Sequence, residues 1–351
     1  MEKIWWERVP DALAFAAGIS ESLLEEKSVI IQSQGDIPWR GYMVYVIKEA
    51  VKQKNSSKRF ESIEGVDDPG AYLLRKFCKP EKRAMYRPSK TYARFLAEND
   101  DIVLHSRYLW VTANSRENLE MWADFVSAYI KERGSGKEMA AFILEYAGAE
   151  CIDARRGVRQ YVFEDYISEY DRIVFATLAS STVKEEPFIK RYLAELASDV
   201  VENDIELCAE CLKRAQEFLR DPQALTSQIT HNGLRSDGRP FSFSKSREEI
   251  SRAIWLAQIK TVYPVLEEYR EAFVEKYAAD IQAQLPIKST YGEVFADPKE
   301  VELGTLFYMA GQRKLNISSQ EYERLKRYRE ARNVLSHLNV LRFEDVRELR
   351  E

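Results

Sequence analysis

The chain has 351 residues, of which 45% are hydrophobic and 31% are charged, and its formal net charge is −5. This composition is typical of a folded protein of two or three domains and excludes a disordered chain. The acidic balance also excludes a protein that coats nucleic acid nonspecifically, because such binding needs a broad basic surface.

The first residues, Met1-Glu-Lys-Ile-Trp-Trp-Glu7, lack the basic start and apolar run of a signal peptide. No apolar stretch has the length that a membrane-spanning helix needs. We therefore expect a cytoplasmic protein without a membrane partner.

The N-terminal part alternates between helical and strand-like patterns. An apolar-periodic helix over 12–26 leads into a strand-like run, Ser28–Gln32, and a Gly/Pro loop separates it from a helix over 42–54. Further strands are predicted at 102–105, 108–112 and 172–177, and further helices at 118–133, 137–146 and 187–218. Strands that alternate with helices of this length predict an α/β sheet.

The loop after the first strand resembles the phosphate-binding loop of a P-loop NTPase but lacks its residues. Gly35 and Gly41 are separated by five residues instead of four, and Tyr42-Met43 replaces the Lys-Ser/Thr pair that binds phosphates and magnesium. Gly134-Ser-Gly-Lys137 follows a helix rather than a strand and is interpreted as a helix–helix turn. These features favour an NTPase-like module, residues 1–220, that does not hydrolyse ATP, and no cofactor is expected.

The four cysteines indicate neither a disulfide framework nor a metal site. Cys208 and Cys211 form one CxxC inside a predicted helix, and no second CxxC or His pair follows to complete a zinc site. Two half-buried thiols on one helix are the preferred interpretation.

A linker is predicted over 221–245, where Asp-Pro, Asn-Gly and Asp-Gly dipeptides and several serines gather. The remainder, 246–351, is almost purely helical in pattern, with helices over 247–285, 297–309 and 321–338. On the last of these, Lys326, Glu330, Asn333 and His337 share a narrow polar wedge, and Arg332 lies between this wedge and the apolar face.

Glu330-Ala-Arg-Asn-Val-Leu-Ser-His337 resembles the Arg-Asn-x3-His signature of HEPN domains, which are units of four or five helices. The resemblance covers roughly 246–351. It implies a homodimer through this domain and metal-independent cleavage of RNA. It also implies a prokaryotic defence or toxin-like system, in which the N-terminal domain or a regulatory protein partner restrains the nuclease. His337 would be the general acid/base, Arg332 the phosphate clamp, Asn333 the group that orients the imidazole, and Glu330 a modulator that favours the protonated ring.

Arg332 points about 140° away from His337 around the helix, so a twofold dimer would be needed to bring both groups to one phosphate. The alternative is a noncatalytic scaffold that uses the helical domain for dimerisation or docking in a multiprotein complex. In that case His337 complements the dipole at a helix end, and Arg332 forms an ordinary ion pair with Glu330 or Asp345.

Overall fold

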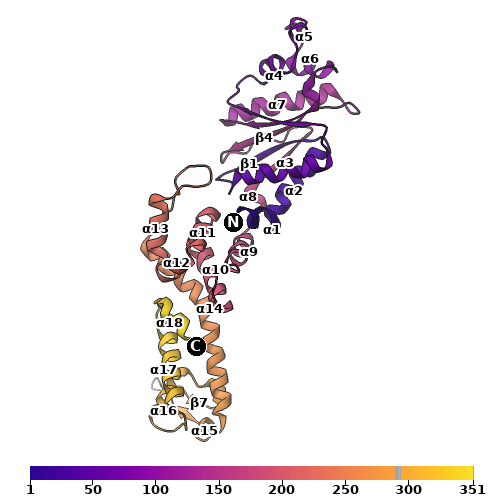
Figure 1. Cartoon of the computed structure of the whole chain (residues 1–351). Helices are drawn as coiled ribbons and strands as arrows, with labels where there is room; N and C mark the ends of the chain where they lie inside the picture. Colours follow the sequence, from indigo (N-terminus) through magenta and orange to yellow (C-terminus); the bar gives the residue numbers. More distant parts are fainter. Residues whose placement is uncertain (289–291, 293, 351) are drawn as a thin grey trace. The chain divides into compact units, whose positions relative to one another are not determined.

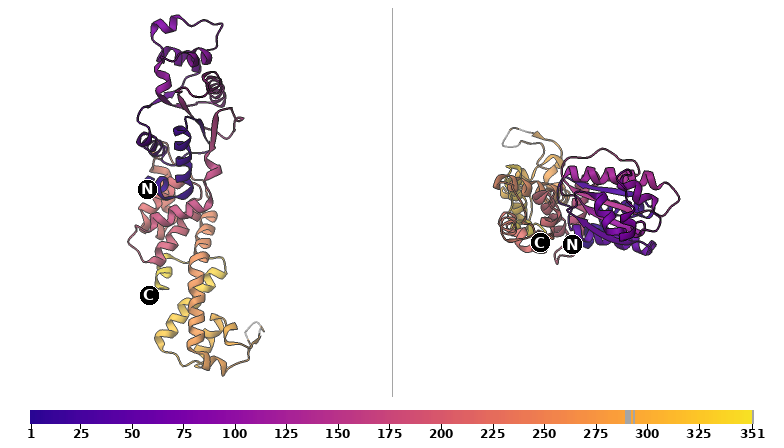
Figure 2. Two further views of the ribbon diagram at one scale, coloured as in Figure 1. Left: turned by 90° about the vertical axis from the view of Figure 1, so that its right-hand side faces the viewer. Right: turned by 90° about the horizontal axis from the view of Figure 1, so that it is seen from above.

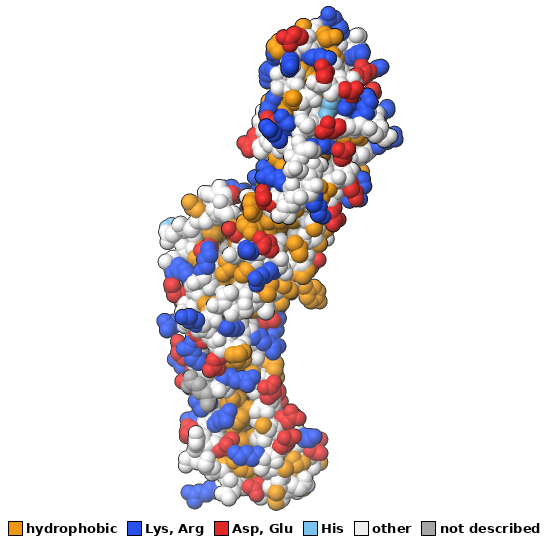
Figure 3. Space-filling model, turned by 45° about the vertical axis from the view of Figure 1, so that its right-hand side comes forward, with side chains coloured by type: hydrophobic (Ala, Val, Ile, Leu, Met, Phe, Trp, Pro, Cys, Tyr) orange, Lys and Arg blue, Asp and Glu red, His pale blue; other side chains and the backbone are white. Residues whose placement is uncertain are grey.

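The computed structural model describes residues 1–288, 292 and 294–350, which form two compact units, Met1–Asp171 and Arg172–Glu351 (Figures 1 and 2). We call them unit 1 and unit 2. On the face drawn in Figure 3, Lys and Arg side chains are mixed with Asp and Glu side chains in each unit. The fold class is as predicted, a parallel α/β sheet followed by a mostly helical region.

Unit 1 is built on a five-stranded parallel sheet with the order β2-β3-β4-β1-β5. This is the strand order of P-loop-like proteins. The strands are β1 (Ser28–Ser33), β2 (Arg59–Glu64), β3 (Arg107–Thr112), β4 (Ala141–Ala147) and β5 (Val158–Val162). All six residues of β1, which lies between β4 and β5, are buried, as expected of a parallel strand covered on both faces.

Helices cover both faces of this sheet. The helices of unit 1 are α1 (Glu2–Arg8), α2 (Pro10–Leu24), α3 (Arg40–Lys54), α4 (Pro69–Phe77), α5 (Pro80–Ala84), α6 (Tyr92–Glu98), α7 (Arg116–Arg133) and α8 (Phe163–Tyr166), with the 3-10 turn η1 (Val103–Ser106). Helix α7 begins where the Ser115 side chain accepts a hydrogen bond from the Asn118 N–H and ends at Gly134, whose φ of 72° suits glycine.

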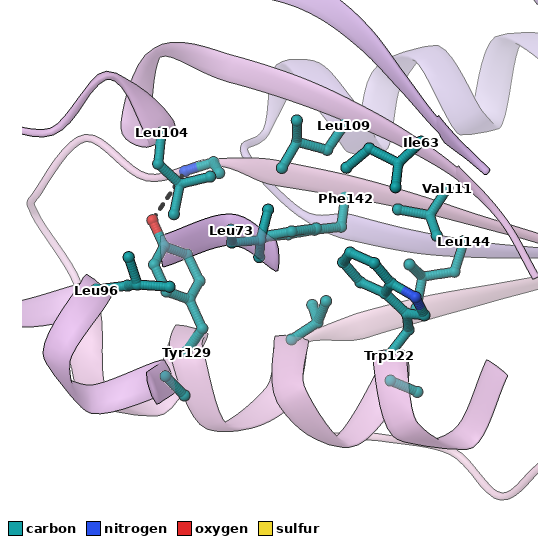
Figure 4. Packing of buried hydrophobic residues seen from close by; sticks show 14 of the residues in the cluster. Ile63, Leu73, Leu96, Leu104, Leu109, Val111, Trp122, Tyr129, Phe142 and Leu144 are labelled. Carbon is teal, nitrogen blue, oxygen red and sulfur yellow. Dashed lines mark hydrogen bonds between the residues drawn. The ribbon is translucent and has the colours of Figure 1, made fainter. Parts of the chain in front are cut away.

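One hydrophobic core of unit 1 lies between α7 and the sheet (Figure 4). Trp122 and Tyr129 project from α7 toward Leu109, Phe142 and Leu144 of the strands. All five side chains are fully buried. Replacement of a buried aromatic side chain of this size by alanine lowers the free energy of unfolding by roughly 3–5 kcal/mol. This packing holds the sheet and its loops in fixed positions.

Three predicted elements of this part differ in the structure. Residues 137–146 hold the strand β4 instead of a helix, so Gly134–Lys137 is a helix-to-strand turn. Residues 172–177 lie in the helix α9 (Glu169–Ser180) instead of a strand, and 102–105 fall mostly in the 3-10 turn η1. In each case a short apolar run fits strand and helix equally well, and its tertiary neighbours decide the outcome.

Unit 2 is arranged around the 30-residue helix α14 (Arg247–Lys276), which begins with a capping box between Ser246 and Glu249. Helix α10 (Pro187–Val201) and helix α17 (Ser319–Ser336) both pack on α14. The other elements are α11 (Ile205–Lys213), α12 (Ala215–Arg220), α13 (Pro222–Asn232), α15 (Ala278–Gln282), β6 (Ile287–Lys288), β7 (Val294–Phe295), η2 (Pro298–Glu300), α16 (Leu303–Gly311) and α18 (Phe343–Glu348).

The division into units does not coincide with the predicted domain boundary. The break falls after Asp171 instead of in 221–245, and the predicted linker contains α13. Helix α10 belongs to unit 2 because its apolar face is buried against α14. Turn-forming dipeptides therefore mark short connections inside unit 2, not a link between domains.

Cys208 and Cys211 are both buried in α11, deeper than predicted. Burial raises the pKa of Cys208 to about 12 and also raises the pKa of Cys211. Within 1–288, 292 and 294–350, no group of three His, Cys, Asp or Glu side chains could hold a metal ion. None of the described helices combines the length and apolar character that a bilayer crossing requires.

Candidate functional site

The loop between β1 and α3 occupies the position of a phosphate-binding loop. Its backbone N–H groups donate hydrogen bonds to a carboxylate of the same chain. Gln34 N–H and Gly35 N–H both donate to Glu164 Oε1, at 2.8 and 3.2 Å. Glu164 lies in α8, directly after β5. Consecutive amide groups of this kind bind anions, and here the anion is a side chain.

The cation at the start of α3 is also engaged. Arg40, the first residue of α3, forms two hydrogen bonds with the buried Glu145 of β4, one of them from Nη2 to Oε2 at 2.6 Å. Trp110 Nε1 of β3 donates to the same Oε2 at 2.6 Å. Bidentate pairing with Glu145 raises the pKa of the Arg40 guanidinium.

Comparison with a P-loop sequence looks for the phosphate-binding cation directly after Gly41, at Tyr42, and so misses Arg40. Helix α3 begins at Arg40, one residue before Gly41. Trp39, with a φ of 45°, adopts the left-handed backbone that a glycine would favour in such a turn. Gly41 follows Arg40, so no hydroxyl is available there for magnesium. Strand β3 ends at Thr112 and is followed by Ala113, neither of which is acidic.

We expect millimolar MgATP to leave the melting temperature of the protein unchanged, because the amides and the arginine already have anionic partners. A ligand present at 100 times its Kd stabilises a protein by about 2.7 kcal/mol, which corresponds to roughly 5–10 °C for a unit of this size. Differential scanning fluorimetry resolves such a shift. A rise of this size with MgATP, absent with magnesium chloride alone, would contradict the expectation.

The polar end of α17 holds the HEPN-like residues. His337 is the C-cap residue and is exposed to solvent. Leu338 follows with a φ of 61° and closes a Schellman-type turn, in which Asn339 N–H donates to Val334 O at 3.1 Å and Leu338 N–H donates to Leu335 O at 3.2 Å. This turn fixes the backbone on both sides of the His337 side chain.

The other candidate residues do not converge on His337 within one chain. Arg332 is partly exposed and donates from Nη2 to Glu302 Oε2 at 2.9 Å, so it pairs with neither Glu330 nor Asp345. Asn333 contributes its backbone carbonyl to the bond from His337 N–H at 3.1 Å. Glu330 is exposed one turn earlier.

An open hollow of about 680 Å³ lies beside this helix end, and we call it the α14 hollow. It is lined by one face of the first turns of α14 and by the residue after His337: Arg247, Glu248, Ser251, Arg252, Trp255 and Leu338. Trp255 Nε1 donates to Leu335 O at 2.9 Å, which ties α14 to the last turn of α17. The volume of the α14 hollow lies within the range of small-molecule sites, about 300–1,000 Å³.

No protein-family model and no curated protein matches the chain. Among solved structures, Rif2 from Saccharomyces cerevisiae is similar at 13% identity, over 68% of this chain and 84% of that one, with a TM-score of 0.27. A DNA replication initiation factor is similar at 13% identity, over 71% of this chain and 76% of that one, with a TM-score of 0.30. These likenesses are distant, and no function follows from them.

Proposed function

We propose that the protein is a metal-independent endoribonuclease of the HEPN type whose reaction takes place at the C-terminal end of α17. The supporting observation is the position of His337, which is exposed to solvent and directly precedes a residue that lines the α14 hollow. A histidine in this position can exchange protons with a bound substrate. The hollow, which Leu338 lines, has the volume that a nucleotide needs.

The proposed reaction uses the ribose 2′-hydroxyl of RNA as the nucleophile. The His337 imidazole accepts the hydroxyl proton or protonates the leaving oxygen, and Arg332 stabilises the charge that grows on the phosphate. Arg332 must leave Glu302 to do so. Since Glu302 is largely exposed, the pair contributes at most about 1 kcal/mol, and a phosphate can replace the carboxylate.

The orientation of Arg332 favours a homodimer, in which the arginine of one chain serves the histidine of its partner. Unit 1 would then be a regulatory or scaffold module, because its phosphate-loop position is filled by Glu164 and Arg40 is paired with Glu145. Restraint by such a module, or by a regulatory protein, suits a nuclease of a prokaryotic defence or toxin-like system.

The direct test is incubation of the purified protein with single-stranded RNA in EDTA. We expect cleavage that leaves 2′,3′-cyclic phosphate ends, detected by mass spectrometry of the products. The same sequence made of DNA lacks the nucleophile and serves as the control. Cleavage that requires a divalent metal, or that also occurs on DNA, would contradict the mechanism.

A second candidate is a noncatalytic scaffold that assembles a multiprotein complex. The observation that favours it is the ion pair of Arg332 with Glu302, which is an ordinary structural role for this arginine. In that case Arg332→Ala and His337→Ala leave every binding property unchanged, and the protein does not cleave RNA in the presence of its partners.

A further inference from the structure

We infer that the α14 hollow binds one nucleotide unit with an unpaired base, as found in a single-stranded segment of RNA, and that Arg247, Arg252 and Trp255 are its binding residues. This inference deepens the proposed function and rests on it for the identity of the strand. The hollow itself is defined by side chains on α14, outside the Arg-Asn-x3-His motif.

The two arginines supply the positive charge. Arg247 and Arg252 are exposed on the first turns of α14, and neither forms an ion pair with a carboxylate in the part of the chain that the structure describes. Many other arginines of unit 2 do have such partners, among them Arg235, Arg270 and Arg347. Unpaired guanidinium groups at a concave surface favour phosphate, which they can bind bidentately.

Trp255 supplies the aromatic surface. Its indole N–H is already bound to Leu335 O at 2.9 Å, which fixes the ring at the wall of the hollow. A fixed aromatic ring loses little entropy when a base stacks on it, and unpaired bases stack readily on tryptophan. Two cations and one aromatic side chain line the hollow within three turns of one helix, against the single carboxylate of Glu248. This set matches a phosphate and its base.

Leu338 is a second unusual feature of the hollow. It is a bulky residue in the left-handed backbone region, with a φ of 61°, and the residue is 72% exposed. Glycine is favoured at this position of a Schellman-type turn, and a leucine there is strained. The leucine places an apolar side chain against the hollow where glycine would leave none.

Binding is best measured apart from cleavage, with a fluorescent 2′-O-methyl RNA strand that cannot supply the nucleophile. Fluorescence anisotropy would compare this single strand, the same strand in a duplex, and adenosine monophosphate. We expect the full-length protein to bind the single strand, and the duplex at least about tenfold more weakly because paired bases cannot reach Trp255. Equal affinity for adenosine monophosphate would overturn the strand as the ligand.

Three variants and one control test the residues that line the hollow. Arg247→Ala and Arg252→Ala should each weaken single-strand binding about tenfold, whereas Lys314→Ala, an exposed cation between α16 and α17, should not change it. Leu338→Gly should keep or raise the melting temperature and still weaken binding. Unchanged affinity in the two arginine variants and in Leu338→Gly would overturn the inference.

The two hypotheses fail in different ways. If the wild-type protein cleaves RNA in EDTA but the arginine variants bind and cleave normally, the nuclease stands and the hollow is not its binding site. If the single strand binds in the hollow but no cleavage is detected with any partner, the binding site stands and the catalytic assignment of His337 falls.

Discussion

Replacement of His337 by alanine is expected to reduce RNA cleavage by about 100- to 10,000-fold, the range that a general acid or base contributes. The other two histidines of the chain lie on other elements: His105 is buried in unit 1, where it hydrogen-bonds Tyr129 Oη, and His231 lies in α13. The rate should be measured under single-turnover conditions on a short single strand in EDTA. His337 is exposed, so its loss should leave the melting temperature unchanged within about 2 °C.

His231→Ala is the matched control, since His231 is also an exposed histidine near the end of a helix of unit 2. It should cleave at the wild-type rate. A His337→Ala protein that cleaves as fast as the wild type would remove this residue from the mechanism. The variant should still bind the 2′-O-methyl strand, because the charged groups of the α14 hollow remain in place.

The sequence was sufficient to predict the fold class because its longest elements have clear signals. The first strand is a short apolar run between two helices, and α14 and α17 show the apolar periodicity of long helices. It failed at β4, where Phe142, Ile143 and Leu144 form an apolar run that fits a helix as well as a strand. Only the pairing of this run with β1 and β3 decides its conformation.

Because β4 is not predicted as a strand, the sequence does not reveal that Glu145 belongs to the candidate site in unit 1. On the predicted helix Glu145 has no partner that the sequence indicates, whereas in β4 it accepts hydrogen bonds from Arg40 and Trp110. Glu164 had no sequence signal either, since it is 130 residues from Gln34, whose amide it binds. The contacts that fill the phosphate-loop position join residues far apart in the chain, and local patterns do not report such contacts.

In unit 2 the motif identified the helix end but not its surroundings. The spacing places Arg332 and Asn333 on α17 and His337 at its end, and the 140° separation of Arg332 and His337 predicts that they do not converge. The partner of Arg332, Glu302, lies 30 residues earlier and could not be inferred. The same holds for Trp255, whose bond to Leu335 O spans 80 residues.

The second large effect is expected in unit 1. Glu145→Ala should lower the free energy of unfolding of this unit by about 2–3 kcal/mol, because the variant leaves the buried Trp110 Nε1 without its acceptor and Arg40 without its carboxylate. Arg40 is partly exposed, so water recovers part of its hydration and keeps the loss below that of a fully buried pair. The melting temperature of unit 1 should fall by roughly 5–10 °C.

Glu145→Gln separates the two contributions, since its amide oxygen can still accept from Trp110 Nε1 but carries no charge for Arg40. It should lose about half as much stability as the alanine variant. Glu150→Ala is the control, because the carboxylate of Glu150 pairs with Arg116 at the surface, where such pairs contribute at most about 1 kcal/mol. If thermal unfolding of Glu145→Ala matches that of Glu150→Ala, the Arg40–Glu145–Trp110 cluster is not a stabilising feature, and the pairing of Arg40 is weak enough for an added anion to compete.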